Sequence, residues 1–392
     1  MKKILFICLF IGFLNNAFCL SDQTEVSVLT CGAGKELHSS FGHSAIRIHD
    51  PATKLDVVYN YGIFNFKTPN FVLKFLRGKL EYKLKKGTFK KFKEYYRSHN
   101  RSVYEQVLNL EYSQINLLHA ALEENVKPEN RFYIYDFYNA NCSTKIIDQL
   151  SAALGDNLQY ISPSVKASTF RQSIQQICIN RPWLSLGLDF LQGRNVDKVP
   201  YDLTEKTNLP IKLFDELKNC YIKIDKNSKV PLVGKYITVH ESNFIDIPKQ
   251  LSPKIFFWIL FIIACYITFS NALSLARLFD WLLFMSLGLI GLMTIFTWSI
   301  SSHLGFSFHV NAIWINPLHL IVAFYILFNP GHALIKKYFL NYNIVFFGML
   351  VYILLYSEEF HTHILPLFLT VLLRSLGRSG KANFKFSLFR SI

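Results

Sequence analysis

Cys142 and His43 are the two residues whose types together could perform nucleophilic chemistry in this sequence. Cys142 lies between an aromatic, strand-like segment and an amphipathic helix expected from Ser143. A thiol in the first turn of a helix meets unpaired N–H groups and the positive end of the helix dipole, which favour the thiolate. A thiolate nucleophile needs an imidazole partner. His43 is the best candidate, because Gly42 precedes it and it begins a predicted strand. Each residue alone also fits a structural role, as a buried thiol or a hydrogen-bonded strand histidine.

The residue that would orient His43 is predicted from strand pairing. Two strand-like runs on either side of an Asp-Pro turn predict a β-hairpin. If Ile48 pairs with Val57, Asn60 shares the face of His43. A slip by one residue would present a neighbouring tyrosine instead. Asn60 is therefore the predicted third residue of the site.

A metal site is the main alternative use of the histidines in this region. His38, His43 and His49 are close in sequence, but His43 and His49 would point to opposite faces of one strand. No CxxC or HExxH pattern occurs, so we expect neither a metal nor a cofactor. Cys31 competes with Cys142 as a thiol, but it is expected in a glycine-flanked loop without a helix start.

Length and composition bound the class of protein. The chain has 392 residues, which predicts two structural units. Hydrophobic residues make up 51% and the mean hydropathy is +0.22. The formal net charge of +15 would ordinarily suggest nucleic acid. However, the apolar residues are concentrated after Ile255 and many of the basic residues flank apolar stretches. We therefore expect a membrane protein with no nucleic-acid partner.

Five apolar stretches follow Ile255, and soluble helices rarely lack a polar face five times running. They cover about 255–275, 279–300, 313–328, 338–356 and 361–373. The first two reach the ~20 residues that cross a bilayer, whereas the third and fifth are short. Basic and non-basic loops alternate, which predicts that Arg277, Lys336, Lys337 and the tail are cytoplasmic. The chain before Ile255 is then outside.

The beginning of the chain predicts a signal peptide. Lys2 and Lys3 precede the apolar core Ile4–Leu14, and cleavage is expected before Leu20. An uncleaved anchor is the alternative. The expected domains are a signal peptide at 1–19, a thiol domain at 20–165, a helical extension at 166–250, and a membrane domain with five helices and a cytoplasmic tail at 251–392. Between 71 and 101, a segment rich in lysine and aromatic residues, we expect a helix and then a basic strand pair. Disulfide pairing among Cys31, Cys178 and Cys220 stays open.

Three segments together resemble the Lnb family, the lipoprotein N-acyltransferases of Bacteroides-type bacteria. They are TCGAGKELHSSFGHSAIRIHDP (Thr30–Pro51), VVYNYGIFNF (Val57–Phe66) and YIYDFYNANCSTKIIDQL (Tyr133–Leu150). The likeness continues in Phe170–Gly193 and in the membrane loop SSHLGFSFHVNAIWINPLHL (Ser301–Leu320), so it covers most of the chain. The FGHS and NCST motifs are moderately specific singly and strong in combination with that loop.

The resemblance implies an α+β exported domain similar to NlpC-type and lecithin:retinol acyltransferase-type enzymes, which are papain-like and often circularly permuted. An all-α membrane domain of about five transmembrane helices would follow it. His43 would be the general base and Cys142 the nucleophile. Here His43 precedes Cys142, which is the order that permutation requires.

The implied reaction moves an acyl chain from a membrane phospholipid, through a cysteine thioester, to the N-terminal amine of diacylglyceryl-cysteine lipoproteins. The implied location is the bacterial inner membrane, with the N-terminal domain in the periplasm. His303, Asn311 and Trp314, expected near the headgroups, are predicted to contact substrate; interfacial anchoring is the alternative. A cell-wall peptidase or amidase that uses the same dyad with water stays open, as does a non-catalytic membrane sensor or assembly protein.

Overall fold

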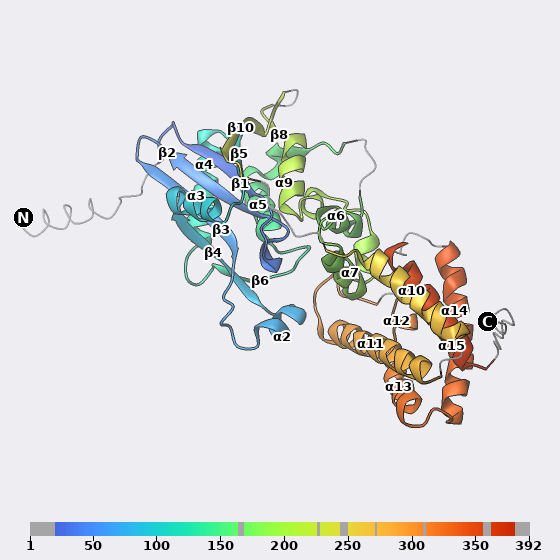
Figure 1. Ribbon diagram of the computed structural model, residues 1–392. Coiled ribbons are helices and arrows are strands. Elements are labelled where there is room, and N and C mark those ends of the chain that lie inside the picture. Colours follow the sequence, from blue (N-terminus) through green and yellow to red (C-terminus); the bar gives the residue numbers. More distant parts are fainter. Residues whose placement is uncertain are drawn as a thin grey trace, which may run out of the picture. The chain divides into compact units, whose positions relative to one another are not determined.

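The computed structural model describes residues 20–163, 168–225, 228–243, 250–270, 273–308, 311–355 and 362–380. The predicted signal peptide, the acidic loop with Glu358 and Glu359, and the tail beyond 380 lie outside these residues. The chain forms two compact units. The sheet unit contains the chain up to residue 68, 81–165 and 201–245; the helical unit contains 69–80, 166–200 and the chain from 246 (Figure 1). Each is described by itself.

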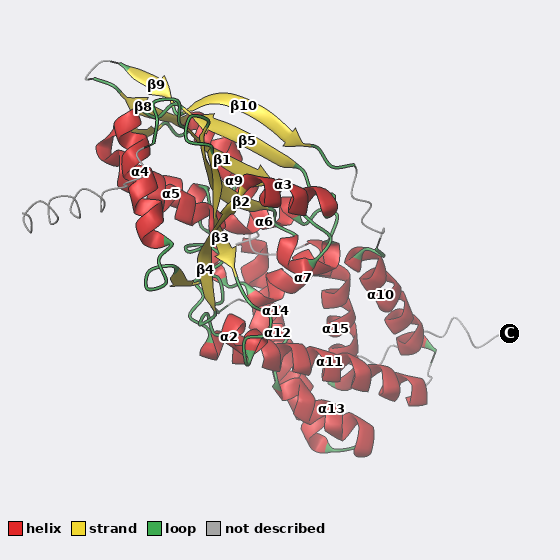
Figure 2. Cartoon of the chain, turned by 90° about the vertical axis from the view of Figure 1, so that its left-hand side faces the viewer, coloured by secondary structure: helices red, strands yellow, loops and turns green. Residues whose placement is uncertain are grey.

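The sheet unit is built on one antiparallel sheet with the strand order β10-β5-β1-β2-β3-β4-β6, drawn in yellow in Figure 2. Its strands are β1 (Glu25–Cys31), β2 (His43–Asp50), β3 (Leu55–Ile63), β4 (Glu81–Thr88), β5 (Val103–Leu108), β6 (Phe132–Ile134) and β10 (Val233–His240). A smaller sheet joins β7 (Leu158–Tyr160), β8 (Cys220–Lys223) and β9 (Lys229–Pro231). The predicted hairpin is present as β2 and β3, and Ile48 pairs with Val57. This register is the one that puts Asn60 on the face of His43.

Helices cover both faces of the large sheet. On one face, α5 (Cys142–Leu154) packs against β2, β3 and α4 (Tyr112–Asn125), and Ile146 and Leu150 are buried with Ile46. On the other face, α3 (Phe89–Ser98) buries Phe92 and Tyr96 in a second cluster. The described part of this unit also contains two short helices, α8 (Leu203–Lys206) and α9 (Pro210–Glu216), and 3-10 turns at 37–39, 155–157 and 217–219.

Two segments differ from their predicted secondary structure. Residues 89–98 form α3 instead of a second strand, because the Thr88 hydroxyl accepts the Lys91 N–H as a helix cap and the buried aromatics are four residues apart. The expected helical extension at 166–250 is divided between the units. Its part from 201 belongs to the sheet unit and supplies β8, β9 and β10, and β10 pairs with β5 at the edge of the large sheet.

The helical unit contains α2 (Phe71–Leu76), α6 (Phe170–Ile177), α7 (Pro182–Leu191), α10 (Pro253–Phe269), α11 (Leu273–Ile300), α12 (Asn311–Trp314), α13 (Leu318–Phe328), α14 (Ala333–Leu355) and α15 (Leu365–Arg378). Short 3-10 turns cover 194–197 and 362–364. Among the described residues, α11 and the stretch 311–328 are long and apolar enough to cross a membrane, and α10 is a shorter apolar helix. The five predicted spans correspond to α10, α11, α12 with α13, α14 and α15.

Close approaches and charge pairs hold this bundle together. Gly291 of α11 lies against the irregular backbone between α12 and α13, and a Cβ there would be 2.3 Å from the Ile315 carbonyl oxygen. Asp280 of α11 is fully buried and accepts from Arg374 at 2.6 and 2.8 Å and from Arg378 at 2.6 Å. An isolated charge at this depth would be costly, so the arginines of α15 fix the packing of the two helices.

Candidate active site

Cys142 is the first residue of α5, one position earlier than the predicted helix start. Asn141 caps this helix: its side-chain oxygen accepts the N–H groups of Ser143 at 2.8 Å and Thr144 at 3.2 Å. The Thr144 hydroxyl accepts the Asn141 N–H at 2.9 Å and completes a capping box. The Asn141 amide nitrogen also donates to the Asn208 carbonyl at 2.8 Å. The NCST motif is therefore a rigid helix start that holds Cys142 in place.

The structure brings His43 and Asn60 to Cys142. His43 begins β2, Asn60 lies on β3, and all three side chains are half-buried. His43 Nε2 is 2.5 Å from Asn60 Oδ1. Because an amide oxygen only accepts, Nε2 carries the proton, and Nδ1 is left to exchange a proton with the thiol. A side-chain hydrogen bond joins His43 to Cys142.

The electrostatics of the pair favour a thiolate beside an imidazolium. Burial raises the pKa of Cys142, but the charge and hydrogen bond of His43, the Ser44 N–H and the Ser143 hydroxyl outweigh it, so the pKa is lowered. Burial lowers the pKa of His43, but Cys142 and then Asn60 outweigh it, so the pKa is raised. Such a pair is the activated form of a nucleophilic cysteine.

Gly62 of β3 lies against the dyad. A Cβ added there would be 3.5 Å from His43 Cε1 and 3.6 Å from Cys142 Cβ, and the backbone has φ +85°. The sequence interpretation missed this residue. A glycine directly after the predicted strand, which ended at Tyr61, was the available signal, because a glycine in or beside a strand often marks a close approach of the backbone to another group.

Three tyrosines, Tyr82, Tyr133 and Tyr135, lie near Cys142. Burial first, and then the negative charge of Cys142, raises the pKa of Tyr82 and Tyr133. Tyr135 stacks on Tyr82 with ring centroids 4.2 Å apart. These residues come from β4, from β6 and from the segment just after β6. Tyr133 and Tyr135 were predicted only as part of an aromatic strand, and Tyr82 only as part of the segment 71–101. They add aromatic rings to the otherwise polar surroundings of Cys142.

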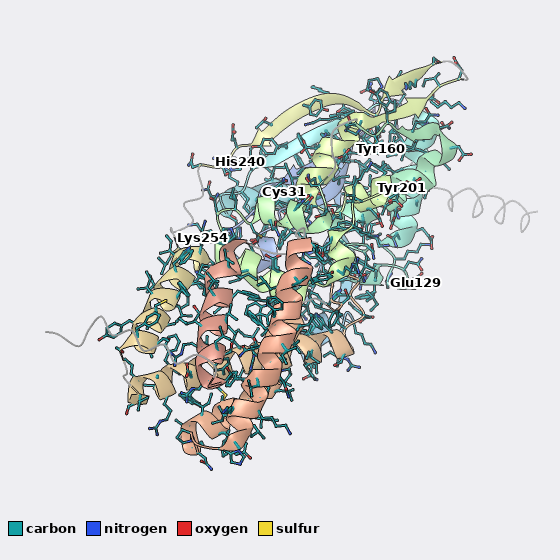
Figure 3. The ribbon with its side chains drawn as sticks, turned by 90° about the vertical axis from the view of Figure 1, so that its right-hand side faces the viewer. Cys31, Glu129, Tyr160, Tyr201, His240 and Lys254 are labelled. Atoms are coloured by element: carbon teal, nitrogen blue, oxygen red, sulfur yellow. The ribbon has the colours of Figure 1, made fainter. Side chains whose placement is uncertain are left out.

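Cys31 is the last residue of β1, where a loop was expected, and it pairs directly with His43 across the sheet. Figure 3 labels it. Burial raises the pKa of this thiol far above its usual value, against the opposing effects of Arg101 and Tyr96. The pKa shifts of the two thiols therefore have opposite directions, raised at Cys31 and lowered at Cys142.

The cysteines in the described part of the chain are all free, which answers the open question about Cys31, Cys178 and Cys220. Burial raises the pKa of Cys178 to about 11 and that of Cys220 to about 12. Within the same residues, no group of three or more histidine, cysteine or acidic side chains is placed to hold a metal ion.

The three predicted substrate-contact residues belong to the helical unit and have partners within it. His303 Nε2 donates to the Phe75 carbonyl at 2.7 Å. Trp314 is fully buried and donates to Asn311 Oδ1 at 2.9 Å. His319 Nε2 in turn donates to the Trp314 carbonyl at 2.9 Å. These contacts explain all three residues as parts of the packing, and a contact with substrate stays a prediction.

Comparison with known families gives two matches. Residues 16–176 match the Lnb N-terminal periplasmic domain, and residues 244–380 match the Lnb transmembrane domain. The chain belongs to the Lnb family. Both Lnb domains occur in the expected order, and the periplasmic match includes His43, Asn60 and Cys142. This Lnb protein is therefore a membrane protein with a periplasmic N-terminal domain. Comparisons with curated proteins and with solved structures give no match.

Proposed function

We propose that this Lnb protein transfers an acyl chain from a membrane phospholipid, through a thioester on Cys142, to the N-terminal amine of diacylglyceryl-cysteine lipoproteins. The observation that carries the proposal is the Cys142, His43 and Asn60 arrangement at the start of α5. It lies in a periplasmic domain joined to a membrane domain. Both substrates are held in lipid, which gives a reason for joining a thiol site to membrane helices. The proposed location is the inner membrane, with the tail in the cytoplasm.

The first half-reaction forms the thioester. The Cys142 thiolate attacks the ester carbonyl carbon of the phospholipid, and the bond between that carbon and the glycerol oxygen breaks. The protonated His43 gives its proton to the leaving oxygen, so the lysolipid departs as an alcohol. Asn60 keeps the ring oriented by accepting from Nε2.

The second half-reaction releases the acyl chain as an amide. The lipoprotein α-amine attacks the thioester carbon, His43 accepts a proton from the amine, and the carbon–sulfur bond breaks. Cys142 returns as a thiolate beside a protonated His43. Amines attack thioesters readily, so no further activation is required.

Two features support the proposal. The first concerns the fold of the domain and the second the type of substrate. His43 on a strand precedes Cys142 on a helix packed against that sheet, which is the arrangement of a permuted papain-like domain. The aromatic rings of Tyr82, Tyr133 and Tyr135 near Cys142 suit an acyl chain better than a hydrated cell-wall glycan.

Mass spectrometry of the intact protein in phospholipid nanodiscs tests the proposal. We expect an acyl adduct that hydroxylamine removes, and its transfer to a synthetic diacylglyceryl-cysteine peptide. Cys142→Ala should carry no adduct, whereas Cys31→Ala should carry it. Absence of both adduct and transfer would overturn the proposal. Cleavage of cell-wall peptides by the same protein would assign the dyad to hydrolysis instead.

A further inference from the structure

The segment 69–80 lies between β3 and β4 in sequence, but it belongs to the helical unit. Its helix, α2, has no fully buried side chain. Val72 is 67% exposed and Leu73 is 40% exposed. Because successive residues turn by about 100° around a helix, the half-buried Leu76 falls between them. The three side chains form one apolar face, named here the α2 apolar face.

Basic residues border the α2 apolar face. Lys74, Arg77 and Lys79 are exposed, and 69–80 contains no acidic residue. Viewed down the helix axis, Arg77 and then Lys74 lie next to Leu73, at the edge of the apolar face. An apolar face flanked by long basic side chains is typical of helices that lie in a membrane interface, where the charged ends reach the lipid phosphates.

The end of α2 is held by the loop that follows α11. The Gly78 N–H bonds to the Phe75 carbonyl and the Lys79 N–H to the Lys74 carbonyl, both at 2.9 Å, which completes a Schellman cap. Ser302 donates its hydroxyl to the Arg77 carbonyl at 2.9 Å. Gly78 has φ +63°, and a Cβ there would be 2.6 Å from Ser302 Oγ. This junction therefore fixes α2 directly against residues 302 and 303.

A second segment, residues 191–195, contacts the same loop and the end of α11. The Gly193 N–H donates to the Gly305 carbonyl at 2.8 Å, and Asn195 donates to the Leu304 carbonyl at 3.1 Å. Trp298 of α11 donates to the Leu191 carbonyl at 2.9 Å.

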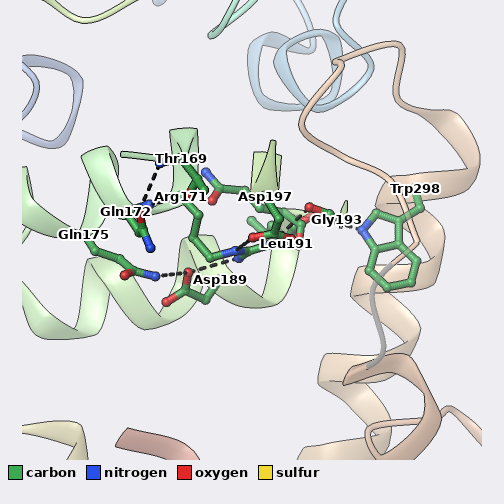
Figure 4. A network of polar contacts seen from close by, with 10 residues as sticks. Thr169, Arg171, Gln172, Gln175, Asp189, Leu191, Gly193, Asp197 and Trp298 are labelled. Atoms are coloured by element: carbon green, nitrogen blue, oxygen red, sulfur yellow. Dashed lines mark hydrogen bonds and ion pairs between the residues drawn. The ribbon is translucent and has the colours of Figure 1, made fainter. Parts of the chain in front are cut away.

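Figure 4 shows how the buried Arg171 supports this second segment. Its guanidinium bonds to Asp197 at 2.5 and 3.1 Å, to Asp189 at 3.1 Å, and to the carbonyls of Gln192 and Gly193 at 3.3 and 3.1 Å. Asp197 and Asp189 balance the buried charge. The segment is therefore rigid where it meets the loop.

These contacts locate α2 along the membrane normal. The membrane-crossing helix α11 ends at Ile300, two residues before Ser302. Residues 75–78 lie within the matched periplasmic domain, so the loop that bonds to them is on the periplasmic side. A helix fixed two residues beyond the end of a span lies at the depth of the lipid headgroups.

We propose that α2 is an interfacial helix in the periplasmic leaflet of the membrane. Val72, Leu73 and Leu76 enter the boundary of the acyl chains, and Lys74, Arg77 and Lys79 bind lipid phosphates. The partner is the lipid surface itself. The inference does not depend on the chemistry of Cys142.

Spin labelling in nanodiscs tests the depth of α2. In a Cys142→Ala, Cys265→Ala background, labels are attached after Val72→Cys and, as the control, Leu117→Cys, an apolar residue of α4 that is 60% exposed. We expect oxygen dissolved in the lipid to relax the label at 72 several-fold more than a water-soluble nickel complex does, and the reverse at 117. Equal exposure of both labels to nickel would overturn the proposal.

A charge series tests the basic border. Adding the anionic lipid phosphatidylglycerol to phosphatidylcholine nanodiscs should increase the protection of the label at 72 from the nickel complex. The triple variant Lys74→Gln, Arg77→Gln, Lys79→Gln should lose this increase. The matched control, Lys90→Gln, Lys91→Gln, Lys93→Gln, removes the same charge from exposed positions on α3 and should keep it. Equal loss in both variants would refute phosphate binding at α2. Protection that requires an added diacylated lipopeptide would identify a substrate surface instead.

Discussion

The hydroxyl oxygens of Ser44 and Ser143 lie 3.3 Å apart, and both side chains are fully buried. Ser44 follows His43 on β2, and Ser143 follows Cys142 on α5. One contact therefore joins the strand of the proposed base to the helix of the proposed nucleophile. This explains why a small hydroxyl residue stands directly after each member of the dyad.

Ser143→Ala should weaken both the site and the fold. It removes a hydrogen bond that lowers the pKa of Cys142, so this pKa should rise and alkylation by iodoacetamide should need a higher pH. The Ser44 hydroxyl loses its partner, at a cost of about 1–3 kcal/mol in unfolding free energy. Adding Ser44→Ala should cost less than the sum of the single changes, measured by thermal unfolding. Strict additivity would show that the hydroxyls are not coupled.

Cys142→Ser should abolish N-acylation of lipoproteins, because a serine hydroxyl gives almost no anion at neutral pH. His43→Ala should reduce the rate by about 10²–10⁴-fold through loss of general acid–base catalysis. Cys31→Ser should retain activity, since burial keeps that thiol protonated. The readout is the mass of lipoprotein N-termini at equal protein abundance. Activity that depends on Cys31 and not on Cys142 would reverse the assignment.

Asn60→Ala should change the pH profile on its alkaline side. The active pair needs a Cys142 thiolate and a protonated His43, so activity falls at low pH when the thiol is protonated and at high pH when the imidazolium is lost. Asn60 contributes to raising the pKa of His43. Its removal should move the alkaline limb of kcat/KM to lower pH and leave the acid limb nearly in place. A shift of the acid limb alone would argue against this role.

Gly62→Ala tests the backbone that faces the dyad. A side chain at φ +85° costs about 1–2 kcal/mol in stability. The added methyl would contact both His43 and Cys142, and we expect a further activity loss of about 10- to 100-fold from displaced catalytic groups. Gly87→Ala on β4 is the control, because a Cβ there meets nothing within 4 Å. Similar activity in the two variants would remove Gly62 from the site.

The packing of α11 can be tested with two glycines of the membrane helices. Gly291→Ala places a methyl 2.3 Å from the Ile315 carbonyl oxygen, and such overpacking costs about 1–3 kcal/mol. Gly348→Ala on α14 meets nothing within 4 Å and should be neutral or slightly stabilising. Thermal unfolding in detergent compares the two. A stable Gly291→Ala protein would show that the junction of α12 and α13 relaxes easily.

Local pattern was enough to predict some of this structure and not the rest. The β2–β3 register follows from alternation within one hairpin, so Asn60 could be predicted beside His43. The position of Gly62 against Cys142 depends on how α5 packs on the sheet, which no short segment encodes. Within 71–101, a segment dense in lysine and aromatic residues, a helix and then a strand pair were predicted. Only the helical spacing of Phe92 and Tyr96 indicates that residues 89–98 form α3.

The junction between α2 and the loop after α11 also sets an order of events during synthesis. The Ser302 hydroxyl lies 225 residues beyond the carbonyl of Arg77 that accepts it. At about 5–20 residues per second, a ribosome needs roughly 10–45 s to make that stretch. For this interval α2 has its local Schellman cap but lacks the hydrogen bond from Ser302. The contact that fixes α2 can therefore form only after α11 has been made.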